Sequence, residues 1–102
     1  MPTNVDIYID FFEKIPEEDW CVFKKKNNFG QRCAIGHLSK GGSDFYYKCS
    51  GLFWKYLGTS ITSINDDCMG TLKHYGYTPK ERVLNALHEI KKLQQEEQRK
   101  QI

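Results

Sequence analysis

The sequence predicts a mainly helical α+β domain, in which about three principal helices pack with a short β-hairpin. Two observations carry this prediction: apolar residues recur at helical spacing in three stretches, and one short run between them is β-prone. The chain has 102 residues, close to the commonest size of one domain. We therefore expect a single globular domain over residues 1–102, with a polar helical tail from about residue 94.

The first predicted helix begins near Thr3, whose spacing to Asp6 fits a capping box. Its apolar stripe recurs at steps of three and four residues. The stripe comprises Val5, Tyr8, Ile9, Phe12 and Ile15. Pro16 lacks the N–H group that a continuing helix needs, so the helix should end there.

The hairpin is predicted around a cluster of lysines. Residues 20–23 are aromatic and β-branched, residues 24–28 are polar enough for an exposed turn, and residues 29–33 supply a returning strand. An isolated hairpin is only marginally stable, so this one must pack on helices. A short helix is expected over residues 33–40, ended by the glycines that follow.

A second long helix is predicted over residues 44–57. Ser43 is a good N-cap for it, and Gly58 is a typical stop. Its buried face comprises Tyr46, Cys49, Phe53 and Leu57. Burial of a large aromatic side chain is worth about 2 kcal/mol, so this helix should be the spine of the core.

The last helix has the clearest start signal, after an irregular stretch with a short element at residues 61–64. Thr78 supplies an N-cap, Pro79 the first helical position and Glu81 the capping glutamate. The buried stripe comprises Val83, Leu84, Leu87, Ile90 and Leu93. The coiled-coil register lasts only two heptads, so packing on the core is favoured and a homodimer contact is the alternative.

Composition excludes several classes of protein. No apolar run approaches the roughly 18 residues of a membrane-spanning helix, and the N-terminus lacks a signal-peptide pattern. We therefore expect a cytoplasmic protein whose cysteines are thiols. Their spacings, with no C-x-x-C, fit no zinc pattern, and no metal or cofactor is predicted.

Cys33 is the candidate nucleophile of an enzyme hypothesis. It follows a glycine turn at a predicted helix start, where the helix dipole favours a thiolate. His74 would be the base, oriented by Asn65 or Asp66, and the activity would be that of a cysteine-dependent hydrolase or transferase. The structural alternative is a buried Cys33, with Asn65 or Asp66 reaching the turn at residues 30–33 and tying two loops together.

A second group of residues suggests binding. These are the lysines of the hairpin turn, the arginine beside them and nearby aromatic side chains. They comprise Trp20, Lys24, Lys25, Lys26, Phe29, Arg32, Tyr75 and Tyr77. The net charge is only +2, and glutamates elsewhere oppose a broad basic surface, so nucleic acid is the less favoured partner. A solvated charge cluster is the alternative.

The order of these motifs resembles a family of small bacterial and phage proteins described only as a domain of unknown function, with a G-x-x-C-A-L-G-A-L … N-D pattern. The matching motifs are Trp20, Gly30-x-x-Cys33-Ala34-Ile35-Gly36-x-Leu38, Ile64-Asn65-Asp66, and a helix opening near Pro79 with Arg82-Val83-Leu84-x-Ala86-Leu87. They span about residues 20–90, and His37 departs from the pattern, which has a small residue there. The resemblance brings no activity, substrate or cofactor. It implies a phage or mobile-element accessory protein.

We therefore expect a small non-enzymatic binding protein. It would act as an accessory or anti-defence factor that blocks a host or phage protein, or that sequesters a small polar ligand. The cysteine-dependent hydrolase or transferase is the alternative.

Overall fold

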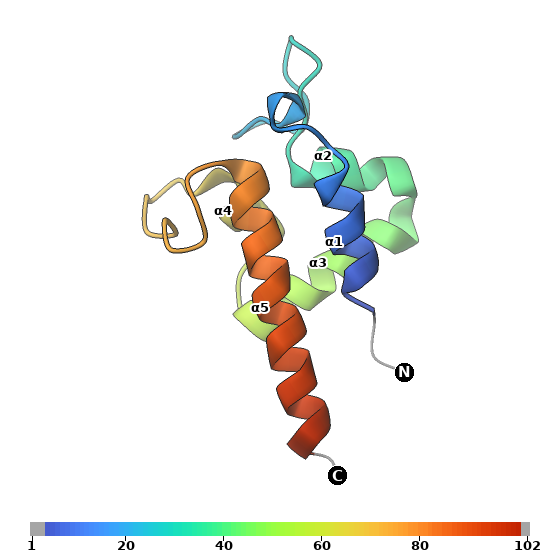
Figure 1. The fold of residues 1–102 in the computed structure, drawn as a ribbon. Helices are drawn as coiled ribbons and strands as arrows, with labels where there is room; N and C mark the ends of the chain where they lie inside the picture. The colour runs from blue at the N-terminus through green and yellow to red at the C-terminus, as the bar shows by residue number, and fades with distance from the viewer. Residues whose placement is uncertain (1–3, 101–102) are drawn as a thin grey trace.

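The computed structural model describes residues 4–100, which form five α-helices and two short 3-10 helices (Figure 1). In chain order the elements are α1 (Asp6–Glu13), η1 (Glu17–Asp19), α2 (Ala34–Leu38), η2 (Ser39–Gly41), α3 (Ser43–Leu57), α4 (Ile61–Asp66) and α5 (Pro79–Lys100). The predicted capping contact of Thr3 lies outside the described residues. Within them, the Asn4 side chain accepts the N–H of Asp6 at 2.9 Å at the start of α1.

The three long predicted helices are present as α1, α3 and α5, and α1, α3 and α4 all contact α5. The α3 helix ends at Gly58, which adopts the left-handed conformation typical of a helix stop. The α5 helix begins with the predicted cap, since Thr78 Oγ1 accepts the N–H of Glu81 at 3.1 Å. The Glu81 carboxylate in turn accepts the N–H of Tyr77 at 2.8 Å.

The core lies where the apolar faces of the five α-helices meet. Its largest fully buried apolar side chains are Tyr8, Phe12, Phe53, Leu38, Ile61, Ile64, Leu87 and Ile90. The 20–33 loop lies at one end of the molecule and the polar last turns of α5 extend from the other (Figure 1). The predicted polar tail is thus a continuation of α5, helical through Lys100.

The predicted α+β class is wrong, because residues 4–100 contain no strand and therefore no hairpin. Only isolated bridges occur: Arg32 pairs with Trp20 in parallel fashion and with Lys26 in antiparallel fashion. The expected first strand is interrupted at Phe23, whose φ of 65° is left-handed. The Asp66 carboxylate fixes this turn by accepting the Phe23 N–H at 3.1 Å. A contact across 43 residues therefore overrides the local β-propensity.

Candidate functional site

The inner side of the 20–33 loop is held by Asn65, which is fully buried. Its Oδ1 accepts the N–H of Ala34 at 3.0 Å, at the start of α2. Its Nδ2 donates to the carbonyl of Cys21 at 3.0 Å and to Asp66 Oδ1 at 2.8 Å. This side chain therefore joins α4 to both ends of the loop, a structural role like the alternative expected for it, although its partners are Cys21 and Ala34 and not the turn at residues 30–33.

Arg82 holds α4 from the side of α5. Its guanidinium, on a residue only 3% exposed, donates to the carbonyl of Ile64 at 2.9 Å and to that of Asn65. Carbonyls at the end of a helix have no partner within the helix, so a buried cation there satisfies them. A continuous hydrogen-bonded path therefore runs from α5 through α4 to the 20–33 loop.

Gly36 allows the loop to lie directly on α2. A Cβ atom at Gly36 would come within 2.3 Å of the Lys25 carbonyl oxygen, which is closer than real Cβ contacts. The same carbonyl accepts the N–H of Cys33 at 3.2 Å. The glycine thus lets the loop backbone at Lys25 settle against the helix, and this contact sets where the Lys25 side chain emerges.

His37 lies beneath the loop and is 4% exposed. Its Nε2 is 2.9 Å from the carbonyl oxygen of Asp19, and its ring packs on Trp20 with centroids 5.3 Å apart. Because a carbonyl only accepts, Nε2 carries the proton. Burial lowers the pKa of His37, and the positive charges of Lys40 and Arg32 lower it further.

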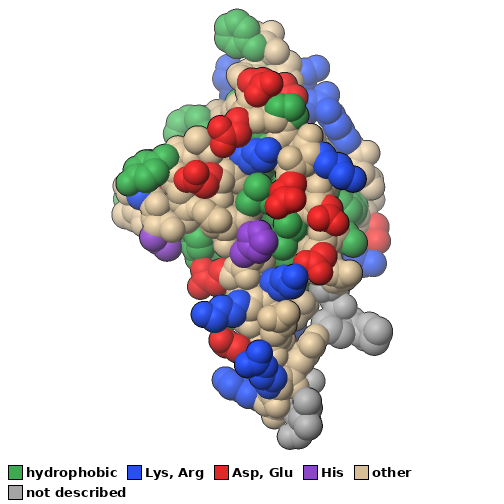
Figure 2. Space-filling model, viewed as in Figure 1, with side chains coloured by type: hydrophobic (Ala, Val, Ile, Leu, Met, Phe, Trp, Pro, Cys, Tyr) green, Lys and Arg blue, Asp and Glu red, His purple; other side chains and the backbone are tan. Residues whose placement is uncertain are grey.

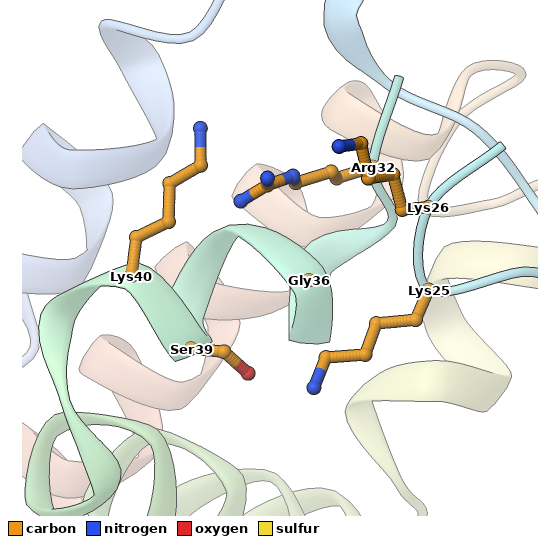
Figure 3. A pocket seen from close by; sticks show the side chains of 6 residues that line it. All are labelled: Lys25, Lys26, Arg32, Gly36, Ser39 and Lys40. Carbon is orange, nitrogen blue, oxygen red and sulfur yellow. The ribbon is translucent and has the colours of Figure 1, made fainter. Parts of the chain in front are cut away.

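The outer side of the loop and the α2–η2 turn enclose a basic pocket, with a cavity volume of about 510 Å³. The basic pocket is lined by Lys25, Lys26, Arg32, Gly36, Ser39 and Lys40. In Figure 3 the Arg32 guanidinium extends toward Lys40, and Lys25 extends toward Ser39. Among residues 4–100, none of these four cations forms an ion pair with an acidic group.

A second hollow adjoins the basic pocket, with a volume of about 320 Å³. Lys25 and Ser39 line both. The rest of this tyrosine hollow is formed by Ile35, Ser43, Tyr46 and Tyr47. The Tyr47 ring is 69% exposed, and it meets the Tyr46 ring nearly edge-on at 5.1 Å. Aromatic side chains are thus available beside the cations.

The residues of the enzyme hypothesis are distributed differently. Cys33 is buried at the N-cap of α2, whereas His74 is exposed and stacks on Tyr75 with centroids 4.3 Å apart. No hydrogen bond joins Cys33 to His74 in the described part of the chain, and Asn65 and Asp66 bond to the loop. The structure therefore brings Asn65 close to the Cys33 segment but does not bring a base to its thiol.

The predicted binding residues fall into two places. Lys25, Lys26 and Arg32 meet in the basic pocket, while Lys24 and Phe29 are exposed on the same loop. Trp20 is instead buried in the core, 5% exposed, and is not available to a ligand. Tyr75 and Tyr77 lie in the separate segment between α4 and α5, where Tyr75 is half-buried and Tyr77 is exposed.

Sequence reasoning missed three residues of the basic pocket, which are Gly36, Ser39 and Lys40. The only signal in the sequence is the spacing of four residues between Arg32, Gly36 and Lys40, and it does not define one helix face, because Arg32 precedes α2 and Lys40 lies in η2. Arg82 was recognised only as part of a motif, because nothing in its own helix shows that it caps another.

No helix within residues 4–100 is long and apolar enough to span a membrane. No three His, Cys, Asp or Glu side chains gather as a metal site in that same range. The chain matches no family model, no curated protein sequence and no solved structure.

Proposed function

We propose that this protein is a non-enzymatic binding protein that holds a small phosphate-bearing ligand in the basic pocket. The observation that carries the proposal is the set of four cationic side chains around one cavity, with no acidic partner among the described residues. Cationic side chains that line one cavity and lack counter-charges attract an anion to it.

The chemistry of the four groups favours phosphate among anions. Arg32 offers a planar guanidinium that binds two phosphate oxygens at once, and the three lysines offer point charges. A cavity of about 510 Å³ falls in the range of roughly 300–1,000 Å³ that is typical for small-molecule sites. Hence a compact phosphate-bearing ligand matches the pocket in both charge and size.

The distribution of charge supports a small ligand over a long nucleic acid. Figure 2 shows Lys and Arg side chains at the end that carries the 20–33 loop and again along the lower half of the molecule, with Asp and Glu side chains spread between them. The net charge of +2 is low for a protein that follows a phosphate backbone. The visible face therefore carries no broad basic surface of the kind that a long nucleic acid would need.

The lining of the basic pocket also supports binding over catalysis. Its described members are lysine, arginine, serine and glycine, and Ser39 Oγ donates to the Ile35 carbonyl at 2.9 Å. General acid–base catalysis near neutral pH usually relies on a histidine or a carboxylate within reach of the reacting group.

Isothermal titration calorimetry with inorganic phosphate, diphosphate and tripolyphosphate tests the proposal. We expect affinity to rise with the charge of the anion and to fall with added salt. The double variant Lys26→Gln/Lys40→Gln should lose at least about tenfold in tripolyphosphate affinity, since a hydrogen bond to a charged group is worth about 1.5–3 kcal/mol.

The matched control is Lys92→Gln/Lys100→Gln, which removes the same charge from exposed sites on α5, whose last turns extend from the end of the molecule opposite the 20–33 loop (Figure 1). It should bind tripolyphosphate within about twofold of the parent chain, because surface charges beyond a Debye length of about 10 Å are largely screened. Equal losses in both double variants would show only non-specific attraction and overturn the proposal. So would the absence of heat with all three anions.

A further inference from the structure

We infer that the ligand of the basic pocket is a nucleoside triphosphate, whose phosphates lie among the four cations and whose base lies against Tyr47 in the tyrosine hollow. This inference rests on the proposed function and names the class of ligand. It depends on an observation that the proposed function does not use, namely the position of the tyrosine hollow.

The two cavities are neighbouring parts of one surface, because Lys25 and Ser39 line both of them. The inferred ligand would extend from one cavity into the other past these two side chains. One part of this surface is cationic and the other is aromatic. A nucleotide has the same division, with charged phosphates at one end and a flat aromatic base at the other.

The tyrosine hollow offers a stacking platform. Tyr47 is 69% exposed and Tyr46 meets it nearly edge-on, so the side of Tyr46 supports the more exposed ring. Every nucleobase has a π-face, and stacking on an aromatic side chain is therefore possible for any base. Ser43 on the same wall supplies a hydroxyl for a polar edge.

The number of cations in the basic pocket favours a ligand with three phosphates over one with a single phosphate. Four cationic side chains line it, and a triphosphate carries about four negative charges at neutral pH. A monophosphate, with a charge of about −1.5 to −2, would leave part of the positive charge uncompensated. The pocket volume of about 510 Å³ also exceeds what a single phosphate group fills.

The other exposed aromatic side chains do not offer the same combination. Phe29 is 88% exposed on the 20–33 loop, and Tyr77 is 78% exposed between α4 and α5. Neither residue is among those that line the basic pocket or the tyrosine hollow. Tyr77 therefore serves as the matched control for Tyr47.

The experiment compares ATP with inorganic tripolyphosphate by calorimetry, in EDTA so that the phosphates meet only protein cations. The parent chain should bind ATP about tenfold more tightly, through stacking of the base. Tyr47→Ala should reduce ATP affinity to that of tripolyphosphate, whose own affinity stays unchanged. Tyr47→Phe should restore the preference for ATP, and Tyr77→Ala should leave both affinities unchanged.

The outcomes separate this inference from the proposed function. Equal binding of ATP and tripolyphosphate by the parent chain would overturn the nucleoside assignment and leave the phosphate-binding proposal standing. Failure of both anions to bind would overturn both. An unchanged preference for ATP in folded Tyr47→Ala would place the base elsewhere and also overturn the assignment. Circular dichroism of each variant verifies that it is folded.

A nucleoside triphosphate can be a free metabolite or the 5′ end of an RNA strand. A 5′-triphosphorylated dinucleotide distinguishes the two sources in the same titration. Affinity equal to that of ATP, or lower, indicates a free nucleotide. Affinity at least about tenfold higher indicates that a second nucleotide also stacks, as at the end of a strand. Both sources require the same contacts to the triphosphate and to the base. Tyr47→Ala should therefore weaken binding of ATP and of the dinucleotide alike.

Discussion

The polar groups on the two sides of the 20–33 loop differ in burial and in bonding. On the inner side, Asn65 and Arg82 are buried, and four of their hydrogen bonds go to backbone groups at 3.0 Å or closer. On the outer side, Lys25, Lys26 and Lys40 are exposed and have no acidic partner among residues 4–100. Both sets are polar, but only the inner set has its bonding capacity used within the chain.

The difference indicates which polar groups hold the fold and which are available to a ligand. A buried polar group without a partner costs about 1–3 kcal/mol, so the inner groups must be satisfied for the loop to exist. An exposed cation without an ionic partner is solvated by water, so it lowers the stability of the fold very little. The inner side therefore fixes the loop, and the outer side can bind an anion without rearrangement of the fold.

The largest loss of stability is expected from Asn65→Ala, which removes the hydrogen bonds that hold the inner side of the 20–33 loop. The Ala34 N–H and the Cys21 carbonyl both lose their partner, and we expect a loss of about 3 kcal/mol in the free energy of unfolding. Urea denaturation followed by circular dichroism measures it. The control Asn28→Ala, at an exposed site, should change stability by less than about 0.5 kcal/mol. Equal stability of both variants would contradict a structural role for Asn65.

Thiol labelling measures whether the buried cysteines react in the folded protein. Cys21, Cys33 and Cys49 are buried, whereas Cys68 is exposed. Burial raises the pKa of Cys49 to about 12 and raises the pKa of Cys21. Iodoacetamide should modify Cys68 at least about a hundredfold faster than the other three, which react only when the structure opens. Rapid modification of Cys33 in the folded protein would favour the cysteine-dependent hydrolase or transferase instead.

Two glycine substitutions test whether close packing of the loop on α2 connects its inner and outer sides. Gly36 lies at this contact, and Gly51 in α3 is the control. Gly36→Ala places a Cβ against the Lys25 carbonyl, so the loop must shift, at a cost of about 1–3 kcal/mol. Gly51→Ala, in the middle of α3 with open space around its Cβ, should instead stabilise by about 0.5–1 kcal/mol. In thermal unfolding, Gly36→Ala should therefore lower the melting temperature and Gly51→Ala should raise it. Because the shift moves Lys25, only Gly36→Ala should also weaken tripolyphosphate binding.

The smallest effect is the pH dependence carried by His37, whose pKa is lowered by burial. At about pH 7.5 and above this imidazole is almost wholly neutral in both the folded and the unfolded chain, so it contributes almost no pH dependence there. Below that pH the unfolded chain binds a proton that the folded chain resists, so stability falls as pH falls, by at most about 1.4 kcal/mol per pH unit. Urea titrations at pH 7.5, 6.5 and 5.5 measure the slope.

His37→Asn should flatten this part of the pH profile, whereas the exposed His88→Asn should leave it unchanged. A profile that is equally steep in both variants would show that other groups carry the dependence.

The helices could be predicted because their signals are local. The stripe around Phe12, the stop at Gly58 and the cap at Thr78 each depend on neighbours within a turn or two of helix. The 20–33 loop could not, because Asp66 sets the conformation of Phe23 from 43 residues away. Local β-propensity at residues 20–23 is a real preference, but a single long-range hydrogen bond and packing of Trp20 in the core outweigh it.

The candidate site was predictable in part for the same reason. Lys25, Lys26 and Arg32 are close in sequence and were recognised as a basic cluster. Lys40 belongs to the same pocket only because Gly36 lets the loop lie on α2. The role of Asn65 was one of the alternatives considered, but its choice of Ala34 and Cys21 as partners follows from the packing of α4.

Arg82 has a consequence for the order in which a ribosome makes this protein. The guanidinium that secures the Ile64 and Asn65 carbonyls belongs to α5, which is synthesised after α4 and after the 20–33 loop. A nascent chain that has emerged only through α4 lacks these hydrogen bonds, and α4 is then held less firmly where Asn65 bonds to the loop. Assembly of the loop is therefore coupled to the synthesis of α5.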